Sequence, residues 1–292
     1  MQELESWQHT LDAGYTLSGW RTKPSGRPVI FFLHGNGLCS RAYWPMLRHL
    51  RQSYDLVLLD APGHGSSESA GSFQGWANDA ESCYEAWQSL QADYAGVSHH
   101  AVAHSYGGVL STYIMAEHPD CFDSALLLDP VYFPPSMLIT GWIADLLGLV
   151  KYHKLSRTTQ KRRIHWPSRE SVYEHLLAKR IYSRWDRECF DAYVDYGFEE
   201  RADGFHLRCD RNIEAKIFAT LPYDLSRIIS RVCTPCVIIS GDQSYDFVIK
   251  GLPKYCTGHD YLQHKVISGG HNFMLDNPQD TAALVHNNMV FS

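Results

Sequence analysis

Short apolar runs alternate along this chain with longer segments in which apolar residues recur at helical spacing. The apolar runs predict strands at 29–33, 55–59, 125–128, 236–240 and 264–268, together with one that ends just before Ser105. Before them, two short strands are expected at 7–11 and 15–21, joined by a turn at 12–14. The helical spacing predicts helices at about 41–51, 72–90, 109–116 and 278–287. Strands and helices in repeated alternation are typical of a parallel sheet with helices on both faces. We therefore expect an α/β fold with a doubly wound, mostly parallel sheet.

The alternation lapses between residues 131 and 220. This segment is rich in aromatic and basic residues, has helical spacing, and contains no run that resembles a buried parallel strand. Regular alternation returns after it. We therefore expect a core formed by residues 1–130 and 221–292, with residues 131–220 inserted as a helical cap.

Composition narrows the class of protein. The 292 residues include 45% hydrophobic residues, enough to bury a large core. A formal net charge of −6 argues against nucleic-acid binding, which needs an excess of Lys and Arg. The first ten residues lack the apolar run of a signal peptide, and the apolar stretch 137–150 is too short to span a bilayer. Eight scattered cysteines suggest reduced thiols. We expect a cytoplasmic protein without a membrane or nucleic-acid partner.

The segment around Ser105 has the pattern of a nucleophile elbow. An apolar strand reaches the serine, two glycines follow it, and a helix then begins. Such a turn strains the serine backbone and exposes its Oγ, and it requires small residues two positions away on either side. Ala103 and Gly107 occupy those positions, so the pattern is A-x-S-x-G. A serine that only caps the helix is the alternative.

Further motifs follow the other predicted strands, at the edge of the sheet where ligand sites form. They are His-Gly-Asn-Gly at 34–37, Asp-x-Pro-Gly-His-Gly-x-Ser at 60–67, and Gly-His-Asn at 270–272. Together with the elbow they resemble the α/β-hydrolase superfamily, in particular the capped serine hydrolases of its esterase- and lipase-like branch. The resemblance covers nearly the whole chain and implies the α/β-hydrolase fold with a cap.

His271 is the predicted general base. It follows the strand 264–268 in a glycine-rich turn that returns the imidazole to the edge of the sheet. A serine hydroxyl needs an adjacent base, and histidine titrates near neutral pH. We expect His34 and His64 to support loops instead.

Two positions compete for the acid that orients this histidine. Asp129 ends the strand after the elbow, where some members of the superfamily place the acid. Many relatives place it after the next strand, three residues beyond a glycine, but the corresponding residue here is Ser244. Asp242 and Asp246 lie in that loop out of register. We favour Asp129, with Asp242 as the alternative.

The resemblance also implies an oxyanion hole formed by the backbone N–H groups of Asn36 and Tyr106. In the cap region we expect four aromatic residues to bind substrate, namely Tyr132, Phe133, Trp142 and Trp185. The stretch 151–169 contains seven basic and no acidic residues. It is either a rim that attracts an anionic substrate or a solvated surface.

These residues predict a serine hydrolase that cleaves a small ester-like carbonyl substrate through an acyl-enzyme. Such chemistry needs no metal or organic cofactor, and its only partner is the small-molecule substrate. One alternative is hydrolysis of a carbon–carbon bond in a β-diketone-like compound. Another is a ligand receptor on the same fold that has lost turnover.

Overall fold

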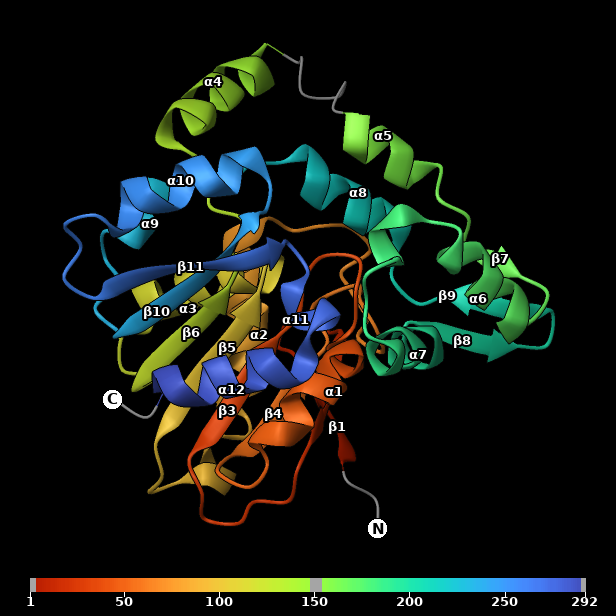
Figure 1. Ribbon diagram of the computed structural model, residues 1–292, viewed down its shortest axis with the longest axis horizontal. Helices are drawn as coiled ribbons and strands as arrows, with labels where there is room; N and C mark the ends of the chain where they lie inside the picture. The colour runs from red at the N-terminus through yellow and green to blue at the C-terminus, as the bar shows by residue number, and fades with distance from the viewer. Residues whose placement is uncertain (1–3, 148–153, 290–292) are drawn as a thin grey trace.

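The computed structural model describes residues 4–147 and 154–289, and its centre is an eight-stranded sheet (Figure 1). The strand order is β1-β2-β4-β3-β5-β6-β10-β11. Strands β3 to β11 of this sheet run parallel, whereas β1 and β2 are antiparallel to their neighbours. This arrangement confirms the predicted doubly wound, mostly parallel sheet. The strands are β1 Glu5–Thr10, β2 Thr16–Arg21, β3 Val29–Leu33, β4 Asp55–Leu59, β5 His99–His104, β6 Ser124–Leu128, β10 Cys236–Gln243 and β11 Leu262–Gly270.

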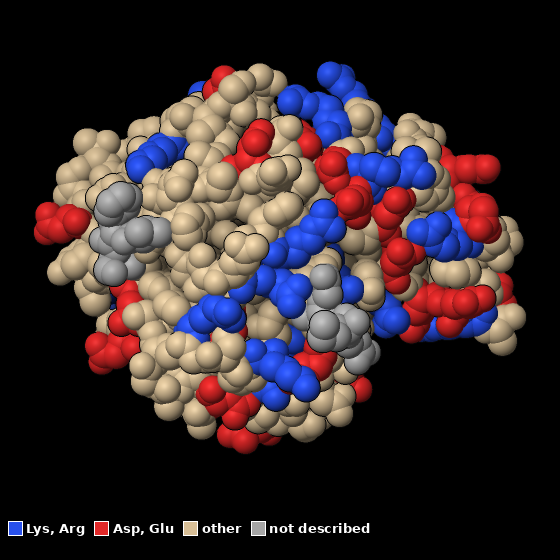
Figure 2. All heavy atoms as spheres, turned by 60° about the horizontal axis from the view of Figure 1, so that its bottom comes forward, with Lys and Arg blue, Asp and Glu red and all other residues tan. Residues whose placement is uncertain are grey.

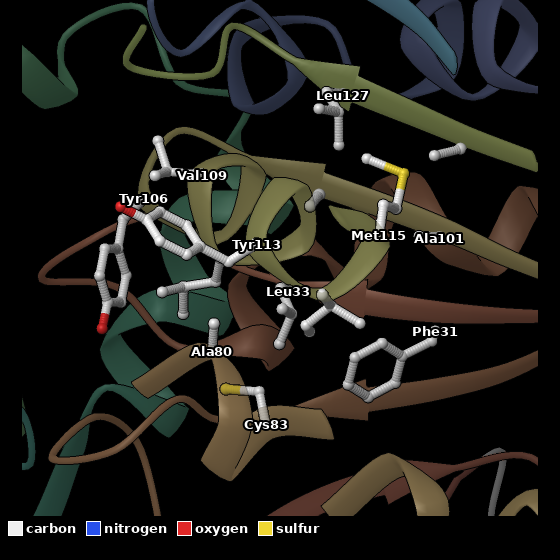
Figure 3. Close-up of a cluster of buried hydrophobic side chains, with 14 of the residues drawn as sticks. Phe31, Leu33, Ala80, Cys83, Ala101, Tyr106, Val109, Tyr113, Met115 and Leu127 are labelled. Carbon is white, nitrogen blue, oxygen red and sulfur yellow. The ribbon is translucent and has the colours of Figure 1, made fainter. Parts of the chain in front are cut away.

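Helices cover both faces of this sheet because its central strands are apolar on both sides. In β3, Phe31 and Leu33 join one buried cluster, and Ile30 and Phe32 join the other. Figure 3 shows the first cluster, where side chains of β3 meet those of α2 (Trp76–Gln88) and α3 (Tyr106–Glu117). The second face packs against α1 (Trp44–Leu47), α11 (Phe273–Asp276) and α12 (Pro278–Met289).

The helix that we predicted at 41–51 is wrong in detail. The segment forms three short turns, a 3-10 turn Ser40–Tyr43, helix α1 and a second 3-10 turn Arg48–Leu50. Pro45 stands in the first turn of α1, where its missing N–H costs nothing. A continuous helix from residue 41 would place that proline in its interior and lose a hydrogen bond there.

Of the chain between β6 and β10, the elements from α4 to α8 lie above the sheet and to its right in Figure 1, whereas α9 lies at the left beside α10 (Asp246–Cys256). We expected this segment to be helical, but it also contains a three-stranded antiparallel sheet of order β7-β9-β8. The β8–β9 hairpin turns at Gly204, whose φ of +130° favours glycine. The elements are α4 Pro135–Leu146, α5 Lys154–Gln160, β7 His165–Trp166, α6 Arg169–Leu177, η5 Arg180–Tyr182, α7 Arg187–Tyr196, β8 Phe198–Arg201, β9 Gly204–Leu207, α8 Arg211–Ala219 and α9 Leu225–Ile229.

The surface carries both signs of charge. On the face shown in Figure 2, basic and acidic side chains lie side by side among larger uncharged areas. In residues 4–147 and 154–289, no helix is both long enough and apolar enough to cross a membrane. All eight cysteines are free thiols, and seven of them are buried.

The carboxyl group of Asp79 is buried in the core beside α3, the helix that follows Ser105. Its side chain on α2 is 1% exposed and accepts a hydrogen bond of 2.5 Å from the Tyr106 hydroxyl. Burial raises the pKa of Asp79 to about 7, although the bond from Tyr106 partly opposes this shift. The native state therefore holds a proton on Asp79 at pH values where the unfolded chain has released it.

We predict a pH-dependent contribution of Asp79 to stability. Because its native pKa is raised, that contribution is complete below about pH 4 and is lost as pH rises towards 7, at about 1 kcal/mol per pH unit. Asp79→Asn removes this titration. The difference in free energy of unfolding between wild type and Asp79→Asn, measured by urea denaturation from pH 4 to 8, should change by that slope and level off above pH 7. The exposed Asp120→Asn serves as control, and a difference for Asp79→Asn that is independent of pH would contradict the prediction.

Candidate active site

The candidate active site forms where the strand order changes direction. The chain passes from β3 outward to β4 and from β5 outward to β6, so the loops after β3 and β5 diverge and leave a crevice between them. Leu33 and Ala103 are register partners, which places Ser105 beside the loop that follows β3. A methyl group on Gly35 would lie 3.3 Å from Ser105 Cβ, so the two loops are in close contact.

Ser105 occupies the strained turn that its sequence pattern predicts. Its φ of 55° and ψ of −114° lie outside the regular helical and extended regions, and α3 begins at the next residue. A methyl group on Gly107 would lie 2.6 Å from the Leu33 carbonyl oxygen, so only glycine fits at that position. Ala103, by contrast, is fully buried within β5, where its methyl group is accommodated. The A-x-S-x-G pattern thus meets the steric requirement on the helix side.

His271 connects Ser105 to Asp129. Its Nε2 lies 2.9 Å from Ser105 Oγ, and its Nδ1 lies 2.5 Å from Asp129 Oδ2. Because a carboxylate can only accept, Nδ1–H is the donor to Asp129 and Nε2 is left to accept the serine proton. The three side chains come from the ends of β5, β6 and β11, which lie at one edge of the sheet.

Asp129 has the geometry of the orienting acid. It is fully buried with a φ of 47°, and its Oδ1 accepts a hydrogen bond of 3.0 Å from the Gly241 N–H. Its Oδ2 also accepts a short hydrogen bond from the Ser244 hydroxyl. Ser244 therefore supports the carboxylate from the loop after β10, where the resemblance described above implies the acid of many relatives.

The competing acids point elsewhere. Asp242 is exposed, and its Oδ1 accepts a hydrogen bond of 2.9 Å from the Gly269 N–H. Asp246 lies 3.7 Å from Lys250 in a solvent-exposed ion pair. Within the described residues, neither aspartate has a hydrogen bond to His271, so the geometry favours Asp129 over Asp242.

The backbone donors expected to stabilise an oxyanion lie beside Ser105. Asn36 and Tyr106 both line the same cavity as Ser105 and His271. In residues 4–147 and 154–289 neither N–H group has a protein acceptor. The Asn36 side chain is directed away from this role, because its Nδ2 donates to the Glu214 carbonyl oxygen at 3.2 Å and its Oδ1 lies 3.0 Å from His64 Nε2.

A series of hydrogen bonds behind Ser105 joins two loops. One is the loop after β3 that contains Asn36 (residues 34–38, called the oxyanion loop below), and the other is the turn that contains His271. The Gly35 N–H donates to the Tyr43 hydroxyl at 3.1 Å, and that hydroxyl donates to His104 Nδ1 at 2.6 Å. His104 Nε2–H then donates to the His271 carbonyl oxygen at 3.0 Å. Burial lowers the pKa of His104 well below its usual value, so the ring is neutral, as these donor and acceptor roles require.

His34 joins the loops that follow β3 and β4, as expected from the sequence. Its Nε2 accepts a hydrogen bond of 3.0 Å from the Ala61 N–H, and its Nδ1 donates to the Gly35 carbonyl oxygen at 2.8 Å. Burial lowers the pKa of His34 to about 4, so this support persists at neutral pH.

A cavity of about 740 Å³ opens above Ser105. Two of the four aromatic residues that we expected to bind substrate, Phe133 and Trp185, line it. The structure does not bring the other two, Tyr132 and Trp142, into the lining. Tyr132 is fully buried with its hydroxyl 2.5 Å from Thr112 Oγ1, and Trp142 is 54% exposed because α4 turns a different face to the cavity.

Several residues of the site have no motif that would reveal them. Tyr43 and Ser244 act through single hydroxyl groups, and a lone hydroxyl carries no spacing signal. Arg162 and Glu214 line the cavity as a buried ion pair but lie 52 residues apart in the chain. The ring centroid of Tyr245 lies 4.7 Å from that of His271, and Tyr245 belongs to the loop after β10, where the sequence departs from the expected position of the acid.

One group among the described residues has the side chains of a metal site. The ligand atoms of His165, Asp203 and His206 lie within 4.8 Å of one another on the small antiparallel sheet. They are hydrogen-bonded among themselves, and none of them lines the cavity above Ser105. They therefore lie apart from the candidate active site.

Removal of the Tyr43 hydroxyl should weaken the positioning of the loops around Ser105 without changing Ser105 itself. Tyr43→Phe leaves the Gly35 N–H and His104 Nδ1 without partners, which should lower the free energy of unfolding by about 1–3 kcal/mol. If about 1.4 kcal/mol of this loss also raises the activation free energy of the serine reaction, Ser105 should be labelled about tenfold more slowly by a fluorophosphonate. Tyr54→Phe is the control, because Tyr54 precedes β4 at the opposite edge of the sheet. Unchanged labelling of Tyr43→Phe would show that the bonds do not position the site.

Comparisons with known proteins agree with this architecture. The model of the alpha/beta hydrolase family matches residues 30–284. A monoglyceride lipase of Mus musculus is 33% identical in an alignment of 118 residues that covers 37% of this chain and 37% of the lipase. Two solved structures are similar over nearly the whole chain. An E-2-(acetamidomethylene)succinate hydrolase has a TM-score of 0.73 at 21% identity, covering 97% of this chain and 98% of its own. An esterase of M. tuberculosis has a TM-score of 0.73 at 18% identity, covering 99% and 93%. The chain therefore belongs to the α/β-hydrolase family.

Proposed function

We propose that this protein is a serine hydrolase that cleaves a small ester through an acyl-enzyme. One observation carries the proposal: Ser105, His271 and Asp129 form a continuous hydrogen-bonded series at the base of a mostly apolar cavity. The members of this series have the order of donors and acceptors that proton transfer from a serine hydroxyl needs.

In the acylation step, Ser105 Oγ attacks the ester carbonyl carbon while His271 Nε2 accepts the serine proton. The carbonyl oxygen becomes an oxyanion that the N–H groups of Asn36 and Tyr106 stabilise. His271 then donates the proton to the departing alkoxide as the carbon–oxygen bond breaks. An alcohol leaves, and the acyl group stays on Ser105.

In the deacylation step, His271 Nε2 accepts a proton from water, and the hydroxide attacks the acyl carbon. The same N–H groups stabilise the second oxyanion. His271 returns the proton to Ser105 Oγ, and a carboxylic acid leaves. Asp129 stabilises the imidazolium in both steps, and Gly241 and Ser244 hold its carboxylate in place.

The cavity supports a small-molecule substrate. Its volume of about 740 Å³ lies within the range of roughly 300–1,000 Å³ that is typical of such sites. The names of two similar proteins, a lipase and an esterase, support ester hydrolysis. Because the lipase match covers only 37% of each chain, the substrate has to be inferred from the cavity itself.

Three substitutions test this mechanism on p-nitrophenyl esters from acetate to octanoate. Ser105→Ala should lower kcat by several orders of magnitude, because the nucleophile is lost. Asp129→Asn should lower kcat by about 10⁴-fold, because the histidine loses its tautomer and its charge partner. Asp242→Asn is the matched control and should stay within a few-fold of wild type, since it has no contact with His271.

The same experiment can overturn the proposal. A large loss for Asp242→Asn with an active Asp129→Asn would show that the acid is misassigned. If folded wild type hydrolyses none of these esters, ester cleavage fails as the function. Labelling of Ser105 by a fluorophosphonate would then favour carbon–carbon bond hydrolysis, whereas ligand binding without labelling would favour a receptor.

A further inference from the structure

A buried ion pair forms part of the cavity wall. Arg162 Nη1 donates to Glu214 Oε1 at 3.0 Å and to Oε2 at 2.9 Å. The Arg162 and Glu214 side chains are 13% and 8% exposed, and both residues line the cavity that contains Ser105. The pair comes from the segment after α5 and from α8, so the region between β6 and β10 supplies both charges.

The ion pair lies against the oxyanion loop. A methyl group on Gly37 would lie 2.5 Å from Glu214 Oε1, so only glycine leaves room for the carboxylate. Tyr193 links the pair to the same loop, since its hydroxyl accepts from Arg162 Nη2 at 2.8 Å and donates to the Gly37 carbonyl oxygen at 3.1 Å. A polar group of a bound substrate can therefore reach this pair close to the reacting carbonyl.

The cavity is apolar beside His271. The ring of Tyr245 lies 4.7 Å from that of His271, and Phe247 stacks on Tyr245 at 5.5 Å. Phe133 stacks on Phe247 at 4.7 Å. The described lining thus has a charged region beside the oxyanion loop and an aromatic region beside the histidine.

The ion pair is suited to a neutral hydroxyl group. A carboxylate at this site would face Glu214, and an ammonium group would face Arg162, so either charge meets a like charge. Each Glu214 oxygen accepts one hydrogen bond from Arg162 and can accept another. A hydroxyl can donate to such an oxygen without adding charge. Packing alone does not account for the pair, because burying two charges costs more than burying apolar side chains of the same size.

We propose that the substrate is an ester with an apolar part and a neutral, hydroxyl-bearing part, and that Arg162 and Glu214 bind the hydroxyl-bearing part. This inference rests on the proposed ester hydrolysis and names its substrate class. It also assigns Arg162, from the basic stretch 151–169, to hydroxyl binding, because Glu214 neutralises its charge. The hydroxyl can belong to the alcohol or to the acyl group.

Matched pairs of substrates test the proposal and distinguish these two sources. 1-Octanoylglycerol and propyl octanoate differ only by hydroxyls on the alcohol, whereas ethyl 3-hydroxyoctanoate and ethyl octanoate differ by one on the acyl group. We expect kcat/KM to favour the hydroxylated member at least tenfold in one of the pairs, because a buried polar group left unpaired is costly. A ratio below twofold in both pairs would overturn the inference.

Glu214→Gln tests the role of the ion pair. It should lower the hydroxyl preference at least fivefold, and it should raise the kcat/KM of monooctyl succinate relative to its methyl ester, because the Arg162 charge is then uncompensated. Glu199→Gln is the matched control, since Glu199 pairs with Arg208 at 3.6 Å on the small sheet, outside the cavity lining. It should leave both ratios unchanged. Unchanged ratios in Glu214→Gln would contradict the proposal.

A second variant guards against misfolding of the first. Arg162→Met/Glu214→Leu replaces both charges by apolar side chains, an exchange that buried ion pairs often tolerate. It should lose the hydroxyl preference without a gain for monooctyl succinate, and a retained preference would contradict the proposal. If wild type hydrolyses no ester at all, the proposed function fails and this inference with it. Hydrolysis of both members of each pair at equal rates overturns the inference alone.

Discussion

The arrangement of the site depends on one buried carboxylate. Asp129 is inaccessible to solvent, and it accepts hydrogen bonds from the Gly241 N–H near the end of β10, from the Ser244 hydroxyl and from His271. A buried carboxylate without such partners would be too costly to keep charged. These contacts therefore hold the ends of β6, β10 and β11 in one position relative to one another.

Neutral histidines organise the opposite side of the nucleophile. His34 and His104 each use one ring nitrogen as a donor and the other as an acceptor, and burial favours this neutral form. Their partners belong to the three connections that follow β3, β4 and β11. The backbone around Ser105 is thus fixed by hydrogen bonds whose direction does not change near neutral pH.

The sequence predicts the centre of the sheet well and the surrounding region poorly. The strand at 29–33 is an uninterrupted apolar run, and the strand at 55–59 is apolar after Asp55. The structure has the same bounds, since short runs of this kind suit a strand buried on both faces. The strand Phe198–Arg201 has the sequence Phe-Glu-Glu-Arg, which no apolar pattern reveals. Tyr132 and Trp142 could not be placed because the direction of each side chain depends on how the segment after β6 packs.

The site shows the same division. The sequence predicts that Ser105 and His271 lie close together, because each follows a parallel strand and the loops after parallel strands lie at the same edge of the sheet. The sequence favoured Asp129 as the acid but left Asp242 as the alternative. The register of β10 against β11 shifts between Gly241 and Gln243, and this shift decides which side chains of the loop face the histidine. A register shift of this kind leaves no mark in the sequence.

The position of Ser244 bears on which strand has to carry the acid. Its hydroxyl and the histidine ring meet at the same oxygen of Asp129, so two strand ends converge on one point from different directions. A negative charge is needed at that point, but its covalent attachment to one strand or the other is not. The geometry around this oxygen therefore fixes where the charge lies more tightly than it fixes which strand carries it.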